Sequence, residues 1–170
     1  LTAVGNTLYF AADDGTNGIE LWMSDGVSAG TQLVKDINSG LPDSSPMYLT
    51  VLGSTVFFQA DDGVNGVELW KSNGRADGTS LVLDIFPGGD PNNSYPNEMA
   101  AVGGTLYFQA EDGTHGSELW KSDGTGVGTV LVKDILPGTD GSFPSYMIAV
   151  DGALFFSADD GLHGVELWNN

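Results

Sequence analysis

Paired carboxylates recur four times along the chain, each pair directly before a glycine. The eight residues are Asp13, Asp14, Asp61, Asp62, Glu111, Asp112, Asp159 and Asp160. Carboxylates this crowded repel one another, and a hard divalent cation with oxygen ligands relieves the repulsion. The pattern raises the hypothesis that these turns bind Ca²⁺. The alternative is that Asp14 and its equivalents accept hydrogen bonds from their own turn amides. The spacing favours this alternative, because it lacks the alternating ligand order of an EF-hand-like loop.

A second group of residues that suits binding is aromatic. Tyr48, Tyr95, Phe143 and Tyr146, with Phe86 near them, lie in or beside stretches of Gly, Pro, Asp, Asn and Ser. Variable loops on a rigid scaffold commonly carry binding sites, and ring faces there suit a sugar. The competing interpretation is that the adjacent prolines 46, 96 and 144 anchor the return of the chain to the first strand of the next copy, and that the aromatics have no binding role.

No residue set has the pattern of a catalytic site. His115 and His163 occupy the repeat position that Asn17 and Asn65 hold in the first two copies. A turn position tolerates this exchange of Asn and His, whereas a catalytic base does not. The segment GVSAG matches G-x-S-x-G, but its equivalents are GRADG and GTGVG and no strand-turn-helix context surrounds it. Carboxylate pairs are too abundant to indicate one acid/base pair. We expect a protein without enzymatic activity, with a glycan-acting hydrolase as the weakest alternative.

These residues are positioned by an internal repeat. Residues 1–48, 49–98 and 99–146 align as full copies, and residues 147–170 align as a partial fourth. Trp22, Trp70, Trp120 and Trp168 mark the common register. We expect one repeat domain over residues 1–170, either a compact four-unit ring or a stretch of a longer array.

Each copy contains four short β-type runs separated by turn signals. In the first copy they cover residues 1–4, 7–13, 19–25 and 31–37. The second and third runs are apolar on both faces, which is typical of a sheet covered on both sides. This pattern predicts an all-β fold, a β-propeller of four-stranded antiparallel blades with three complete blades and a truncated fourth. A β-solenoid or open repeat array is the alternative. The fourth copy stops before its last strand, leaving an edge open to pairing.

A glutamate precedes the Leu-Trp pair in every copy. These residues are Glu20, Glu68, Glu118 and Glu166. A carboxylate in a buried strand needs partners, most simply backbone amides or a hydroxyl such as that of Ser24. We expect these glutamates to hold one blade to the next, and the four tryptophans to form the core between blades.

The motif ELWMSDG with a later GT, repeated as ELWKSNG and ELWKSDG, closely resembles the ELWxxDGT repeat of bacterial secreted and surface proteins. This resemblance covers essentially the whole chain. A looser similarity links FAADDGTNGIELWMSDG to blades of TolB-type propellers. Both resemblances imply a propeller outside the cytoplasm, extracellular or on the bacterial cell surface, and neither implies a reaction. The fourth copy departs from the motif after Trp168.

The charge balance excludes several classes of partner. Among 170 residues, 5 Lys and Arg oppose 23 Asp and Glu, which gives a net charge of −18. Nucleic acid and anionic lipid need a basic face. No apolar run approaches the roughly 20 residues that span a bilayer, so we expect no membrane insertion. With no cysteine, disulfides and thiolate chemistry are excluded.

The repeat register gathers most of the acid on one face, here named the acidic loop face. Its members are Asp13, Asp14, Asp43, Asp61, Asp62, Asp90, Glu111, Asp112, Asp140, Asp159 and Asp160. We expect a binding or adhesion module that takes a glycan or a surface protein on this face, stabilised by calcium if the turns bind it. The alternative is a structural repeat that assembles into a filament or surface layer through exposed strand edges.

Overall fold

The computed structural model describes residues 1–89 and 91–170, so Asp90 of the acidic loop face lies outside the described residues. The described part contains fifteen strands and two short 3-10 helices, η1 (Ser28–Gly30) and η2 (Ala76–Gly78). None of its helices has the length and apolar character needed to cross a membrane. The predicted all-β fold is confirmed.

Each copy of the repeat forms one antiparallel sheet in which neighbours in sequence pair as neighbours in space. The first sheet holds β1 (Thr2–Val4), β2 (Thr7–Asp13), β3 (Ile19–Ser24) and β4 (Gln32–Lys35). The second holds β5 (Met47–Leu52), β6 (Thr55–Asp61), β7 (Val67–Ser72) and β8 (Ser80–Leu83). The third holds β9 (Asn97–Val102), β10 (Thr105–Glu111), β11 (Ser117–Ser122) and β12 (Val130–Lys133). The last holds β13 (Ser145–Val150), β14 (Ala153–Asp159) and β15 (Val165–Asn169).

The fourth strand of each full copy is shorter than predicted. Residues 31–37 read as one strand in the sequence, but β4 ends at Lys35. The reason is that the amides of Ile37 and Asn38 turn toward the carboxylate of Glu20 and donate hydrogen bonds to it. They are therefore unavailable for pairing with β3.

The sheets stack face to face and the core lies between them. We call the face of a sheet that meets the next sheet in sequence its trailing face, and the face that meets the preceding sheet its leading face. Between the first two sheets, Tyr9 and Leu21 on a trailing face pack with Val56, Phe58 and Trp70 on a leading face. Equivalent residues form the clusters between the second and third sheets and between the third and fourth.

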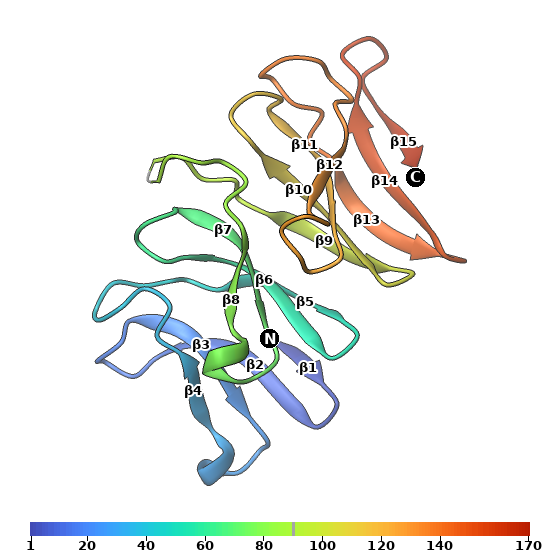
Figure 1. Cartoon of the computed structure of the whole chain (residues 1–170). Coiled ribbons are helices and arrows are strands. Elements are labelled where there is room, and N and C mark those ends of the chain that lie inside the picture. Colours follow the sequence, from blue (N-terminus) through green and yellow to red (C-terminus); the bar gives the residue numbers. More distant parts are fainter. Residues whose placement is uncertain (90) are drawn as a thin grey trace.

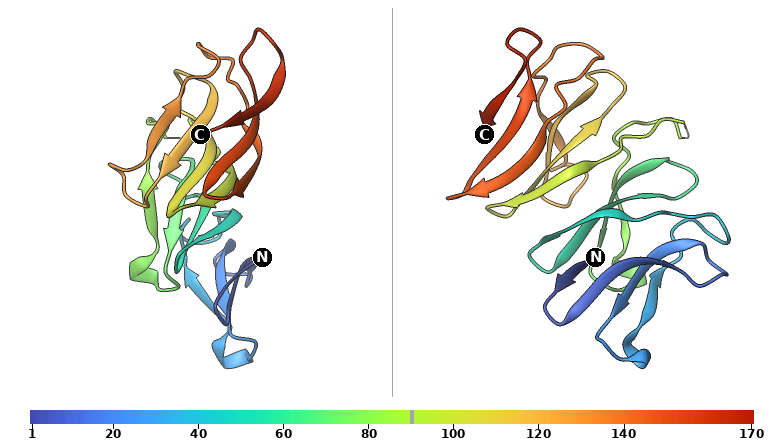
Figure 2. Two further views of the ribbon diagram at one scale, coloured as in Figure 1. Left: turned by 90° about the vertical axis from the view of Figure 1, so that its right-hand side faces the viewer. Right: turned by 180° about the vertical axis from the view of Figure 1, so that it is seen from behind.

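The four sheets follow one another in an open arc. Their first strands β1, β5, β9 and β13 lie side by side along its inner side, and the first and last sheets lie at opposite ends (Figures 1 and 2). The outer strands β4, β8 and β12 lie at the far edges of their sheets. The arc therefore presents one continuous inner surface built from four equivalent strands.

Candidate functional site

Three of the inner strands carry a β-bulge at the same repeat position. In the second sheet Met47 pairs with Gln59 and Thr50 with Phe57, so Tyr48 and Leu49 together lie opposite Phe58. The same two-against-one arrangement places Glu98 and Met99 opposite Phe108, and Tyr146 and Met147 opposite Phe156. A bulge redirects a side chain without ending the strand. Here the second residue of each pair packs against the core, and the first faces the surface.

The first residue of each bulge holds a strained backbone. Tyr48, Glu98 and Tyr146 have φ values of 56°, 51° and 54°. Left-handed geometry at a non-glycine residue costs on the order of 1–3 kcal/mol, and such strain collects at sites of function. Glycine would fit this backbone without strain. Three large side chains there indicate that the side chains themselves are needed.

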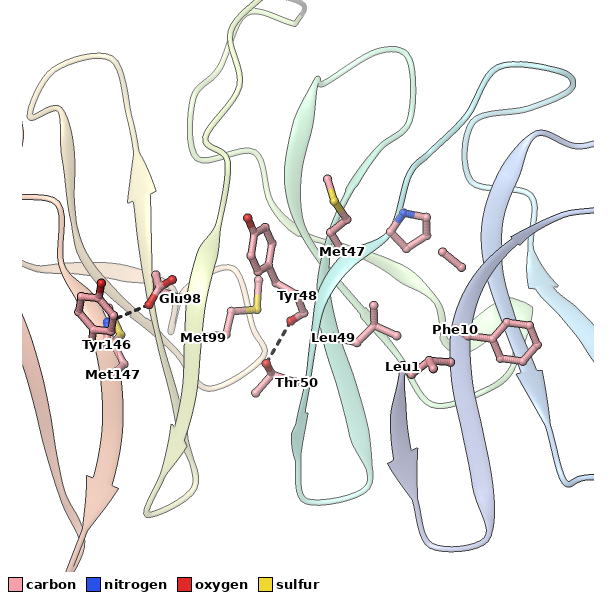
Figure 3. A pocket seen from close by; sticks show the side chains of 12 residues that line it. Leu1, Phe10, Met47, Tyr48, Leu49, Thr50, Glu98, Met99, Tyr146 and Met147 are labelled. Carbon is pink, nitrogen blue, oxygen red and sulfur yellow. Dashed lines mark hydrogen bonds between the residues drawn. The ribbon is translucent and has the colours of Figure 1, made fainter.

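These side chains line a pocket of about 780 Å³ on the inner surface of the arc (Figure 3). That volume lies in the range of small-ligand pockets, roughly 300–1,000 Å³. Leu49, Met99 and Met147 give the pocket apolar walls. Glu98 contributes a carboxylate whose Oε2 accepts a hydrogen bond of 2.8 Å from the Tyr146 amide. Two tyrosines and a carboxylate acceptor thus line one pocket with apolar walls.

The pocket combines aromatic side chains with one carboxylate. Glu98 is the single carboxylate among the described residues that line it, whereas glycoside hydrolysis ordinarily uses two carboxyl groups about 5–10 Å apart. Exposed tyrosines beside one carboxylate provide flat apolar surface together with hydrogen bonding.

The four aromatic residues predicted to bind ligand divide into two pairs. Tyr48 and Tyr146 line the pocket and lie at the starts of β5 and β13, beside the preceding connections and not within them. Tyr95 and Phe143 lie outside the pocket lining, exposed and left-handed in the connections before β9 and β13. Phe86 lies against Gly113 of the next sheet and serves packing. Sequence reasoning missed Glu98, although it occupies the register of Tyr48 and Tyr146, because the search was for aromatic residues.

Seven of the eight turn carboxylates accept hydrogen bonds within their own turns, and Glu111 accepts none from the described residues. Asp62 Oδ1 accepts from the amides of Val64 and Asn65 at 2.9 and 2.8 Å, and its Oδ2 accepts from the Asn65 side chain. The same arrangement recurs at Asp14, Asp112 and Asp160. The first carboxylates Asp13, Asp61 and Asp159 each accept from the amide two residues on. In the described part of the chain no three His, Asp or Glu side chains are grouped to hold a metal ion. The turns therefore have internal partners, and calcium binding remains a prediction.

The histidines replace asparagine as donors in these turns. His163 Nδ1 lies 2.9 Å from Asp160 Oδ2, where Asn17 Nδ2 donates to Asp14 in the first copy. The hydrogen bond from His163 lowers the pKa of Asp160 to about 2, and the bond to Asp160 raises the pKa of His163. The His163 contribution to stability is thus complete below pH about 6.5 and is lost as the pH rises through its raised pKa. The contribution of Asp160 to stability is present above pH about 4 and is lost as the pH falls through about 2.

We expect an NMR titration to give His163 a pKa above about 6.5, and Asp160→Asn to return it toward that value. Asp151→Asn removes an exposed carboxylate at another turn and should leave the titration of His163 unchanged. A His163 pKa that does not respond to Asp160→Asn contradicts the hydrogen bond.

The glutamates before Leu-Trp hold the connections between sheets. Glu20 is fully buried and accepts from the amides of Ile37, Asn38 and Ser44 at 2.9, 3.2 and 3.2 Å, and from the Ser44 hydroxyl at 2.6 Å. The carbonyl of Ser44 in turn accepts from the amide of Asp61 in the next sheet. The hydroxyl partner is therefore Ser44, which corrects the expectation for Ser24. Four residues along a strand span about 13 Å, so Ser24 lies beyond reach and bonds to Thr31.

The later copies repeat this arrangement, except in the fourth sheet. Glu68 and Glu118 are fully buried and bonded to Ser94 and Ser142, whereas Glu166 is exposed. Burial, only partly offset by the hydrogen bonds, raises the pKa of Glu68 to about 7. It also raises that of Glu20.

Three of the four tryptophans lie at the junctions between sheets, as expected. Trp70 and Trp120 are buried in the clusters, and Trp168 packs half-buried against the third cluster. Trp22 is half-buried on the leading face of the first sheet, which no sheet covers, so the expected core role is not met there. Lys35 of the first sheet lies over the Trp70 ring at 5.7 Å from its centroid, a cation–π contact across the junction. Lys133 lies over Trp168 in the same way at 4.9 Å.

The fold and site define an all-β repeat protein with a pocket on its row of inner strands. No family model matches the chain, and no curated protein matches it. A crystal structure of puromycin hydrolase matches 97% of the chain with 13% identity and a TM-score of 0.61. The computationally designed Ika8 protein matches 98% of it with 21% identity and a TM-score of 0.49. The chain spans 25% of the hydrolase and 44% of Ika8. The likeness to the hydrolase shows a shared fold over that part.

Proposed function

We propose that this chain is a non-enzymatic binding module of the β-propeller type, extracellular or on a bacterial cell surface, that holds a glycan on its inner strands. The observation that carries the proposal is the set of three strained bulges. They place Tyr48, Glu98 and Tyr146 in one row along a pocket of ligand size. A surface protein is the alternative occupant of the same row.

The propeller assignment is supported by the arrangement of the sheets. Each is a four-stranded meander, or three-stranded in the last copy, and its neighbours in sequence cover its faces except at the two ends of the arc. Radial repetition of such sheets around inner strands is the architecture of propeller blades. The four sheets correspond to an arc of such a ring. The location outside the cytoplasm is supported by the ELWxxDGT resemblance.

The electrostatics narrow the class of glycan. With a net charge of −18 and Glu98 in the pocket, the protein repels uronic acids and sulfated sugars. Neutral sugars stack on tyrosine faces, and an amino sugar adds attraction to Glu98.

The test is a glycan array of neutral, amino and uronic sugars, run with calcium and with a chelator. We expect binding to neutral and amino sugars, weakened up to about tenfold by Tyr146→Gly, since one aromatic contact contributes on the order of 1 kcal/mol. Glycine also relieves the left-handed strain, so the melting temperature should hold or rise. A melting temperature that is identical in calcium and in chelator rejects calcium at the turns.

Tyr95→Gly is the matched control. Tyr95 is also an exposed, left-handed tyrosine, at φ 46°, but it does not line the pocket. The Tyr95→Gly variant should bind the sugars as wild type does. Equal losses of sugar binding in the two variants would place the site at the connections before β9 and β13. An array without binding in both calcium and chelator contradicts a glycan ligand.

A further inference from the structure

One type of contact joins every pair of neighbouring sheets. On the trailing side, Leu21, Leu69 and Leu119 occupy one register and are 0%, 0% and 2% exposed. On the leading side, Val56, Leu106 and Leu154 occupy another and are each 0% exposed. The three junctions thus bury the same two kinds of face against each other.

Both kinds of face recur uncovered at the two ends of the arc. The leading face of the first sheet presents Leu8, the equivalent of Val56, at 39% exposure. The trailing face of the last sheet presents Leu167, the equivalent of Leu119, at 77%, with Val150 and Ile148 also exposed beside it. Because these lie at opposite ends (Figure 2), neither covers the other within one chain.

We propose that two copies of this chain associate head to tail, the trailing face of β13–β15 in one copy packing on the leading face of β1–β4 in the other. The occupant of each end face is thus a second copy. The two faces match because the molecule already contains their junction three times, with the same positions of the second and third strands on each side. Ile37, Ile85 and Ile135 extend the internal junctions and have no counterpart in the three-stranded last sheet. This contact between sheet faces differs from pairing along the edge of β15.

Such a contact is heterologous, since two different patches meet. Heterologous contacts form rings where the rotation closes and filaments where it does not. The junction would lack the lysine contact that two of the three internal junctions have, Lys35 over Trp70 and Lys133 over Trp168, because the last sheet has no fourth strand. The junction between the second and third sheets forms without that contact, since Leu83 holds the lysine position there. Each chain carries a charge of −18, so salt that screens repulsion favours the contact.

The test uses three variants of the 170-residue chain in sedimentation or light scattering over a wide concentration range, in screening salt. Leu8→Asp blocks the leading end face and Leu167→Asp blocks the trailing one, and aspartate is too short to extend its charge past the contact. Both leucines are exposed, so both variants should fold, which circular dichroism verifies. Val127→Asp, 94% exposed at the turn between β11 and β12, controls for the added charge.

We expect wild type and Val127→Asp to show a mass of two or more chains, and Leu8→Asp and Leu167→Asp each to be monomeric. An equimolar mixture of the two blocked variants should give a mass of two chains and no more, because one intact junction remains in that pair. Wild type that is monomeric at every concentration overturns the proposal. Association of wild type without recovery in the mixture also overturns it, because the contact is then not head to tail.

Discussion

Replacing Glu118 with alanine is expected to lower the free energy of unfolding by about 3–5 kcal/mol. The carboxylate is fully buried and accepts from the amides of Ile135, Leu136 and Ser142 at 3.1, 3.0 and 3.0 Å, and from the Ser142 hydroxyl at 2.6 Å. Alanine leaves all four donors inside the protein without an acceptor. Each unsatisfied buried donor costs about 1–3 kcal/mol, partly recovered by water that enters the space.

The chain contains its own control for this prediction. Glu166 holds the same repeat position in the fourth sheet, where it is exposed and its carboxylate accepts no hydrogen bond from the described residues. Glu166→Ala should change stability by less than about 0.5 kcal/mol. Urea unfolding with an unchanged m value measures both variants. Equal effects at the two positions contradict the role of the carboxylate in holding the connection.

The fold was largely predictable because its determinants are local and repeated. Short apolar runs bounded by Asp-Gly turns predict the second and third strands of each copy, and β2 covers the predicted residues 7–13. The fourth strand was predicted too long, since its end depends on Glu20, which is 17 residues from Ile37 in sequence. A local strand pattern carries no information on such a contact.

The site was less predictable, because a bulge is a property of two paired strands. The residues around Tyr48 read as a loop after Pro46, and only the pairing of Met47 with Gln59 and of Thr50 with Phe57 shows an extra residue in β5. Tyr48 and Tyr146 were found for their chemistry alone. Glu98 was missed because only its position, the first residue of the bulge in β9, places it in line with Tyr48 and Tyr146.

The open ends of the arc were only partly foreseeable. A closed ring and a longer array were both compatible with the sequence, because both are built from the same repeated sheet. What separates them is the rotation between neighbouring sheets, which follows from how side chains such as Phe58 and Trp70 fill each junction. The exposed Leu8 and Leu167 follow from that geometry.

Gly116→Ala is expected to lower the free energy of unfolding by about 3–4 kcal/mol. Gly116 has φ +67°, which alone costs an alanine about 1–2 kcal/mol. A Cβ there would also lie 2.5 Å from the amide nitrogen of Gly141 and 2.8 Å from the carbonyl oxygen of Thr139. Both are backbone atoms, so the connection from β12 to β13 must move away from the turn.

Gly164→Ala separates the two contributions. Gly164 occupies the same repeat position with φ +79°, and an added Cβ would meet nothing within 4 Å. Gly164→Ala should therefore lower the free energy of unfolding by only about 1–2 kcal/mol, the cost of the left-handed backbone alone. In Gly116→Ala, the moved connection also weakens the bond from the Phe143 amide to the Ser117 carbonyl, 3.1 Å in the native chain. Hydrogen exchange at Phe143 should then accelerate in Gly116→Ala beyond what its lower stability explains. Equal destabilisation by the two alanines would mean that the turn and the connection are not in contact.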